Sequence, residues 1–156
     1  MTSRIVQNRP EATHHADAAR QQTVLVVDDE ESIRQLIAVM LEMEGLRVLQ
    51  ADCGEQALDI AATETIDLIT LDVMMPGIDG WEVAGQLDLD DRTAAIPRVM
   101  VSGVPVQELR QAPGAARASA VLAKPFDFVE FVDTAQRLLR APIALPAPRN
   151  GDAIAL

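Results

Sequence analysis

Residues 67–80 read DLITLDVMMPGIDG, and this stretch decides the fold. An apolar run bounded by turn residues is typical of a buried strand, which we expect at Asp67–Leu71. Asp72 follows at the carboxyl end of this strand, just before Met75-Pro76-Gly77 turns the chain. Taken alone, an aspartate at this position is best interpreted as a turn residue.

Other apolar runs that end in polar groups change the interpretation of Asp72. The run TVLVV at residues 23–27 is followed at once by Asp28 and Asp29. Two more runs end in the same way: Arg98–Val101 leads into Ser102-Gly103, and Ala120–Ala123 leads into Lys124-Pro125-Phe126. Strands that alternate with helical segments predict a parallel sheet, and ligands bind at the carboxyl edge of such a sheet.

The remaining elements are predicted from periodicity and from residues that begin or end helices. Apolar residues recur at helical spacing in 30–44, 54–63, 80–89 and 127–140, and a further strand is expected at 46–50. The expected inner faces are Ile33, Leu36, Ile37, Met40 and Leu41 in the first helix, Ala57, Leu58 and Ala61 in the second, and Phe128, Phe131, Val132, Ala135, Leu138 and Leu139 in the last. Asp79 should cap the third helix, and Trp81 should be a partly buried packing residue. The helix at 105–111 should be short, because Pro113-Gly114 prevents its continuation.

Composition and charge exclude several classes of protein. A chain of 156 residues is large enough for one domain with its own core. The net charge of −11 argues against direct binding of nucleic acid, which requires a basic surface. No apolar run is long enough to span a membrane, and residues 1–22 lack a secretory signal, so we expect a cytoplasmic protein. The single cysteine, Cys53, excludes an internal disulfide. Residues 1–22 are expected to form a disordered arm, and residues 141–156 an extended tail that contains proline.

The combined pattern resembles the receiver domain of bacterial two-component response regulators. The matching residues are Asp28-Asp29, Asp72 within residues 71–80, Ser102-Gly103 and Lys124-Pro125-Phe126, and the resemblance extends from Thr23 to Arg140. It implies an α/β fold of the flavodoxin-like, doubly wound type, with a five-stranded parallel sheet of order 2-1-3-4-5 and helices on both faces. In that order the polar groups at the strand ends converge on Asp72. The resemblance also implies a cis peptide bond between Lys124 and Pro125.

The resemblance implies that this site accepts a phosphoryl group. Asp72 would be the carboxylate nucleophile, while Lys124 stabilises the transferred oxygens and Ser102 donates a hydrogen bond to one of them. Crowded carboxylates repel one another unless a cation joins them, and Mg²⁺ prefers oxygen ligands of this kind. In the family, the metal ligands correspond to Asp29, Asp72 and the backbone carbonyl of Met74, with Asp28 acting through water or as an outer ligand. The phosphoryl donor would be a phosphohistidine on a sensor histidine kinase or a phosphotransfer protein.

Two features depart from the family pattern. The fifth strand carries Val121 where the family usually has a tyrosine or phenylalanine that rotates on activation, so we expect the switch to rely on the segment after Ser102 and on the short fourth helix. Met74 and Val104, each two residues beyond a site residue, offer no polar side chain to orient an attacking water. We therefore expect the phosphorylated form to lose its phosphoryl group slowly.

The preferred interpretation is a stand-alone response regulator or phosphorelay intermediate, since no output domain is expected after Arg140. Such a protein catalyses only its own phosphorylation and dephosphorylation, and is not otherwise an enzyme. It would act through a downstream protein partner on the surface of the fourth helix, fifth strand and fifth helix, as a monomer or a phosphorylation-dependent dimer, with no membrane insertion. One alternative is a receiver-like interaction module that is never phosphorylated. A Mg²⁺-dependent aspartyl phosphatase of the haloacid dehalogenase type is less favoured, because its Asp-x-Asp motif after the first strand is absent.

Overall fold

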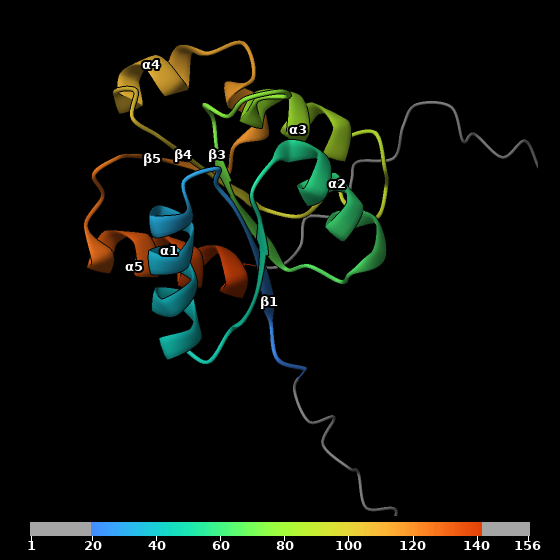
Figure 1. The fold of residues 1–156 in the computed structure, drawn as a ribbon, viewed down its shortest axis with the longest axis vertical. Helices are drawn as coiled ribbons and strands as arrows, with labels where there is room; N and C mark the ends of the chain where they lie inside the picture. The colour runs from blue at the N-terminus through green and yellow to red at the C-terminus, as the bar shows by residue number, and fades with distance from the viewer. Residues whose placement is uncertain (1–19, 142–156) are drawn as a thin grey trace, which may run out of the picture.

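A five-stranded parallel sheet forms the centre of the computed structural model, which describes residues 20–141 (Figure 1). The strands are β1 (Thr23–Val27), β2 (Arg47–Ala51), β3 (Leu68–Asp72), β4 (Arg98–Ser102) and β5 (Ala120–Ala123). Their order is β2-β1-β3-β4-β5, and all neighbouring strands are parallel. This confirms the doubly wound order that the family resemblance implies.

Helices cover both faces of the sheet. They are α1 (Glu31–Met43), α2 (Gly54–Thr63), α3 (Gly80–Leu87), α4 (Val106–Gln111) and α5 (Phe128–Arg140), with a 3₁₀ turn at Ala115–Arg117. In Figure 1, α1 and α5 lie on one side of the sheet, and α2 and α3 lie on the other. Every predicted helix is present, with ends shifted by at most two residues.

The core consists of two apolar layers, one on each face of the sheet. Val24 and Val26 of β1 face the layer that contains residues of α1 and α5, whereas Leu25 and Val27 face the layer that contains residues of α2 and α3. Neighbouring residues along a strand point to opposite faces, so a strand buried on both sides must be apolar throughout. This explains why the runs found in the sequence are continuous and do not alternate with polar residues.

Two residues predicted to face inward are exposed. Leu36 of α1 is 52% exposed and Phe128 of α5 is 44% exposed. At about 100° per residue, Leu36 lies at the margin of the stripe formed by Ile33, Ile37 and Leu41. Phe128 has the angular position of an inner residue, but it is the first residue of its helix. Helical spacing identifies the inner face of a helix, and does not show how far the surface beneath it extends.

The segment after β4 is irregular, as the sequence predicts. Helix α4 has six residues, of which only Leu109 is buried. Beyond it, Gly114 lies against the ring of Trp81 in α3, since a Cβ placed on Gly114 would come 2.7 Å from Cε3 of that ring. Trp81 is partly buried and packs against the core, which confirms its predicted role. The chain after α4 is therefore held against α3.

Two ion pairs stabilise the opposite end of the strands from Asp72, where β4 begins. Arg98, at the start of β4, is 2% exposed, and its Nη1 lies 2.6 Å from Oδ1 of Asp88 at the end of α3. The other carboxylate oxygen of Asp88 accepts a hydrogen bond from Nε of Arg117 at 3.0 Å. One carboxylate therefore joins α3, β4 and the 3₁₀ turn. Asp79 caps α3 at its other end, where Glu82 completes a reciprocal capping box, so the predicted cap is confirmed.

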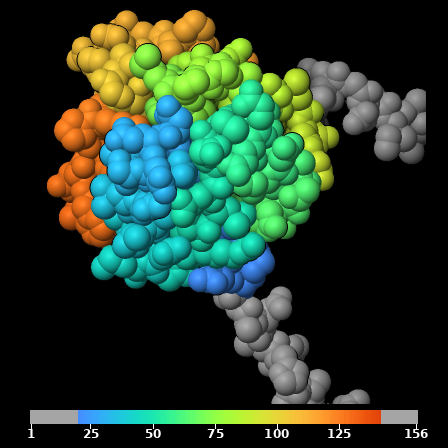
Figure 2. All heavy atoms as spheres, in the orientation of Figure 1, coloured from blue at the N-terminus to red at the C-terminus, as the bar shows by residue number. Residues whose placement is uncertain are grey.

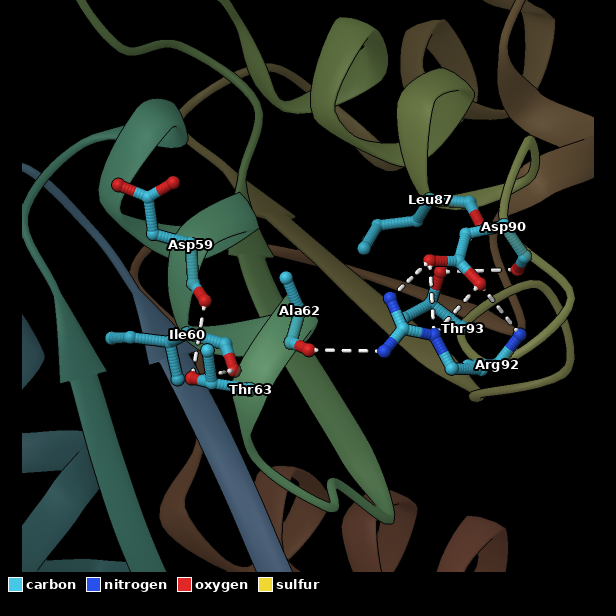
Figure 3. A network of polar contacts seen from close by, with 8 residues as sticks. All are labelled: Asp59, Ile60, Ala62, Thr63, Leu87, Asp90, Arg92 and Thr93. Atoms are coloured by element: carbon cyan, nitrogen blue, oxygen red, sulfur yellow. Dashed lines mark hydrogen bonds and ion pairs between the residues drawn. The ribbon is translucent and has the colours of Figure 1, made fainter.

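The contacts drawn in Figure 3 join the loop between α3 and β4 to α2 and to the end of α3. Nη1 of Arg92 donates to the carbonyl of Ala62 at 3.2 Å, and Oγ1 of Thr93 donates to the carbonyl of Leu87 at 2.7 Å. Hydrogen bonds from Arg92 lower the pKa of Asp90 to about 2. These hydrogen bonds hold the loop in place, although Leu89 within it is 82% exposed.

Residues 20–22, which the sequence analysis placed in the N-terminal arm, contact the domain. Arg20 pairs with Asp67 at 2.7 Å, and the amide of Gln22 donates to the carbonyl of Leu139 at 3.1 Å. The expectations for residues 1–19 and 142–156 lie outside the described residues. None of the helices in residues 20–141 combines the length and the hydropathy that a membrane span requires.

Candidate functional site

The carboxyl ends of four adjacent strands meet at one edge of the sheet. Asp28 follows β1, Asp72 ends β3, Ser102 ends β4 and Lys124 follows β5. Parallel strands all deliver their ends to the same edge, and neighbours lie about 4.8 Å apart. The topology therefore places Asp28, Ser102 and Lys124 around Asp72.

Three carboxylates form the centre of the site. Each of Asp28, Asp29 and Asp72 offers an oxygen atom within 4.8 Å of the others. Asp28 is 1% exposed and Asp72 is 5% exposed, whereas Asp29 is exposed to solvent. The cluster therefore has a buried side and an open side, and a ligand can reach it from the side of Asp29.

Asp28 is fixed by hydrogen bonds at both of its carboxylate oxygens. Oδ1 accepts from the backbone N–H of Glu30 at 2.9 Å, and Oδ2 accepts from Nζ of Lys124 at 2.7 Å. Its backbone N–H donates to the carbonyl of Ala51 at 3.2 Å. Asp28 therefore has little freedom to turn toward another ligand.

Lys124 bridges two of the carboxylates. Its Nζ lies 2.7 Å from Oδ2 of Asp28 and 3.4 Å from Oδ2 of Asp72. Burial alone would lower the pKa of Lys124, but the hydrogen bond with Asp28 and the charges of Asp72 and Asp28 outweigh it and raise the pKa above its ordinary value. The ammonium group is therefore charged at physiological pH. The peptide bond from Lys124 to Pro125 is cis, as the resemblance implies.

Asp72 is the carboxylate whose proton affinity is most disturbed. Burial raises the pKa of Asp72 from 3.8 to about 6; the charge of Lys124 opposes this rise, and the charge of Asp28 adds to it. Oδ1 of Asp72 accepts a hydrogen bond from the backbone N–H of Met74 at 3.1 Å, which orients the carboxylate. One lysine therefore does not neutralise the cluster, and an additional cation would lower its energy.

Ser102 and Met74 flank the acidic cluster. Ser102 is fully buried, and its Oγ accepts a hydrogen bond from the backbone N–H of Val104 at 3.3 Å. The side chain of Met74 is 66% exposed, so only its backbone is fixed beside Asp72. The carbonyl of Ser102 accepts a hydrogen bond from the backbone N–H of Lys124 at 2.7 Å. Within residues 20–141, the hydroxyl of Ser102 forms no hydrogen bond with Asp72 or Lys124.

The donor set fits a hard divalent cation. All three side chains are carboxylates, and oxygen ligands are those that Mg²⁺ and Ca²⁺ prefer. A divalent charge would offset the effects of burial and of the Asp28 charge, which together raise the pKa of Asp72. Mg²⁺ is commonly held by one or two carboxylates and retains bound water, which suits a cluster with one open side.

Sequence reasoning missed Arg34, which also contacts the site. This residue lies in the first turns of α1, and its Nη1 donates to the backbone carbonyl of Asp28 at 2.8 Å. The periodicity of α1 shows that Arg34 is outside the apolar stripe, but gives no indication that its side chain reaches back to the end of β1. A basic residue in an otherwise acidic stretch was the only available signal.

Comparison with known proteins assigns the family. The family model for the response regulator receiver domain matches residues 24–136. The phosphate regulon transcriptional regulatory protein PhoB of Pseudomonas aeruginosa is 37% identical over 118 residues, which are 76% of this chain and 52% of PhoB. The sporulation initiation phosphotransferase F of Bacillus subtilis is 33% identical over 116 residues, which are 74% of this chain and 92% of that protein. The chain thus spans about half the length of PhoB and nearly all of the phosphotransferase.

Similar solved structures are also response regulators. The response regulator TrrA of Thermotoga maritima, determined in complex with Mg²⁺ and BeF, has 31% sequence identity and a TM-score of 0.69 over 76% of this chain and 99% of TrrA. A second structure contains TrrA in complex with the histidine kinase ThkA, with 32% identity and the same TM-score. The described residues share the sheet order and the arrangement of helices that define this fold. The chain belongs to the response regulator receiver domain family.

Proposed function

We propose that this receiver domain accepts a phosphoryl group from a phosphohistidine onto Asp72, with Mg²⁺ as cofactor, and signals by contact with a protein partner. The observation that carries the proposal is the contact of Lys124 Nζ with both Asp28 and Asp72 beside a third carboxylate. A buried carboxylate that is oriented by a backbone N–H and adjoins a fixed cation has the features of a nucleophile for phosphoryl transfer. Transfer of a phosphoryl group to Asp72 requires no catalytic group beyond these.

The residues of the chain divide the chemistry among them. A carboxylate oxygen of Asp72 attacks phosphorus, the bond from phosphorus to the donor imidazole nitrogen breaks, and that nitrogen leaves with the electron pair. Lys124 moves its charge toward the transferred oxygens, and Ser102 donates a hydrogen bond to one of them. Asp29, Asp72 and the carbonyl of Met74 would hold Mg²⁺, and Asp28 would act as an outer ligand. When bound, the metal supplies positive charge that stabilises the phosphoryl oxygens.

The comparisons support a kinase donor and a magnesium site. TrrA binds Mg²⁺ and BeF in one structure and a histidine kinase in the other. One relative, of which this chain covers 92%, is named a phosphotransferase. A cytoplasmic location, as expected from the sequence, is part of the same proposal.

The exposed surface of α1 favours a protein as donor. Leu36, Val39 and Met43 are 52%, 52% and 74% exposed, and they follow one another along the helix at spacings of three and four residues. In Figure 2, α1 lies on the face turned toward the viewer, between α2 and the segment that leads into α5. Contiguous exposed apolar side chains of this kind mark protein contacts. A Val39→Asp variant should slow phosphorylation by the kinase about tenfold and leave phosphorylation by acetyl phosphate unchanged; equal slowing with both donors would contradict this assignment.

Intact-protein mass after incubation with Mg²⁺ and acetyl phosphate tests the proposal. We expect one base-labile phosphoryl group on the parent protein and none on Asp72→Ala. Omission of Mg²⁺ should abolish the addition, and Ser102→Ala should slow it. A folded, Mg²⁺-binding protein that gains no mass would instead be an interaction module. Continuous release of phosphate from small esters would indicate the phosphatase.

The output of this domain is proposed to arise from the segment after β4. Val121 is partly buried against the core and offers no ring that could rotate. The response to phosphorylation would therefore be a change in residues 103–111, which would be read by a partner on α4, β5 and α5. Hydrogen exchange with and without BeF₃⁻ tests this: protection should rise in residues 103–111, whereas unchanged exchange there would refute it.

A further inference from the structure

We propose that Arg34 is a positioning residue that holds Asp29 in the orientation required for metal binding. The inference rests on the proposed function, since it assigns Asp29 to the magnesium site. Arg34 lies six residues after Asp28 and is partly buried in α1. Among residues 20–141, its side chain forms one hydrogen bond, from Nη1 to the carbonyl of Asp28 at 2.8 Å.

This hydrogen bond fixes the peptide group that precedes Asp29. A peptide group is planar, so a bond to the carbonyl of Asp28 also fixes the plane that contains the N–H of Asp29. The peptide group that follows Asp29 is held as well, because the N–H of Glu30 donates to Oδ1 of Asp28 at 2.9 Å. Both peptide groups on either side of Asp29 are therefore anchored by side chains.

Asp29 itself has no such anchor. Its carboxylate is exposed, and among residues 20–141 no hydrogen bond or ion pair of this carboxylate is described. The direction of its side chain therefore depends on the backbone on which it is carried. Asp28 differs, because its two carboxylate oxygens are bonded directly. Loss of the Arg34 contact should release Asp29 and leave Asp28 in place.

The charge of Arg34 and its position predict opposite effects on metal binding. A cation near a cluster of carboxylates repels Mg²⁺, so its removal should tighten binding if charge were its main contribution. If Arg34 instead orients a ligand, its removal should weaken binding. Arg34 forms no ion pair with a carboxylate within residues 20–141, so its charge is not needed to neutralise a partner. Tighter Mg²⁺ binding after removal of Arg34 would therefore indicate a charge effect, and weaker binding would indicate that Arg34 orients a ligand.

The experiment is a Mg²⁺ titration of the ¹⁵N-labelled protein followed by NMR, which reports the affinity and the folded state together. Arg34→Met should weaken Mg²⁺ binding about tenfold, the lower end of the effect of residues that orient metal ligands. Arg34→Lys retains a donor and should remain within about threefold of the parent. Arg137→Met removes the same charge from the last turn of α5 and should change the affinity by less than about twofold.

A second measurement shows whether Arg34 acts through Asp29. In the Asp29→Asn background, Arg34→Met should cause no further loss, because the ligand that it positions is already absent. Unchanged or tighter binding by Arg34→Met would overturn the inference, as would a full additional loss in the Asp29→Asn background. If Arg34→Met does not fold, Arg34→Gln, which is neutral and shorter, replaces it once intact amide dispersion shows that it folds. It should weaken Mg²⁺ binding about tenfold, and an affinity equal to that of Arg137→Met would overturn the inference. Failure of the parent to bind Mg²⁺ would refute the metal site itself, and the role of Arg34 with it.

Discussion

The chain segments on either side of the site differ in how closely they are packed. At the start of α3, a Cβ on Gly80 would clash with the carbonyl oxygen of Asp72 and would lie 2.8 Å from Cα of Val73. After β4, a Cβ on Gly103 would meet no atom within 4 Å. The end of β3 is therefore enclosed by backbone on the α3 side, while the chain beyond Ser102 has open space around it.

This difference indicates where the domain can change shape. Backbone atoms in contact cannot separate without displacing whole elements, so the α3 side should keep its position when Asp72 changes state. The segment from Gly103 to Gln111 contains a short helix with one buried residue. It is held at its far end by Gly114 under Trp81 and by the ion pair of Arg117 with Asp88. A segment that is fixed at both ends and loosely packed between them is the region most able to respond.

The most severe disruption should come from filling the crowded side. Gly80→Ala places a methyl group against the backbone of β3, where neither partner can move without shifting an element. We expect a loss of about 3 kcal/mol in the free energy of unfolding, measured by urea denaturation. Stability equal to that of the parent would show that the α3 side is as adaptable as the β4 side.

The second prediction concerns the free-energy cost of ionising the buried carboxylate of Asp72. Its pKa is about 6 in the folded protein and 3.8 in the ordinary case, so the native state binds more protons than the unfolded state between these values. The stability of the metal-free protein therefore falls as pH rises through this window, and the full penalty is present above pH 6. Asp72→Asn removes the penalty and should raise the free energy of unfolding by about 2 to 3 kcal/mol at pH 7.5, with little change at pH 4.

Urea denaturation in EDTA at several pH values tests this. Asparagine retains the size of the side chain and an acceptor for the N–H of Met74. A stability difference between parent and variant that does not depend on pH would show that Asp72 is not destabilised by its charge.

The third prediction tests the lifetime of the phosphorylated state. Met74 is exposed and Val104 partly exposed, and both are apolar, so neither can orient a water molecule for attack on phosphorus. Met74→Asn introduces a polar group on the α3 side of the site and should accelerate dephosphorylation at least about tenfold. Loss of the phosphoryl mass over time measures the rate, with Met74→Leu as the apolar control. Equal rates for the asparagine and leucine variants would refute the explanation.

The smallest effect is expected on the open side. Gly103→Ala adds a methyl group where no atom lies within 4 Å, so the free energy of unfolding should change by no more than about 0.5 kcal/mol. The same urea denaturation used for Gly80→Ala provides the comparison. A loss as large as that of Gly80→Ala would remove the distinction between the two sides.

The sequence predicts the elements of this fold well because their causes are local. The apolar strands, the cap at Asp79 and the break at Pro113-Gly114 each depend on residues close together in the chain, and all were confirmed. The exposure of Leu36 and Phe128 depends on what lies opposite them in space, and both predictions were wrong. The polar groups at the strand ends could be grouped because the order of strands determines their proximity.

Other details of the site could not be obtained from sequence. Nζ of Lys124 lies 2.7 Å from Oδ2 of Asp28 and 3.4 Å from Oδ2 of Asp72, and a difference of less than one ångström cannot be predicted from sequence. The elevated pKa of Asp72 results from burial by elements distant in the chain. The contact from Arg34 to Asp28 depends on the path of one long side chain. The roles of the site residues in phosphoryl transfer stay predictions.

The packing of Trp81 against Gly114 gives the protein a built-in optical reporter. Trp81 is the single tryptophan, and the chain contains no tyrosine, so the intrinsic fluorescence of the protein originates from this one indole. The indole joins the helix that abuts Asp72 to the chain that follows α4. Its emission wavelength and quenching therefore report, without any label, whether the contact between these two parts of the molecule persists while the state of Asp72 changes.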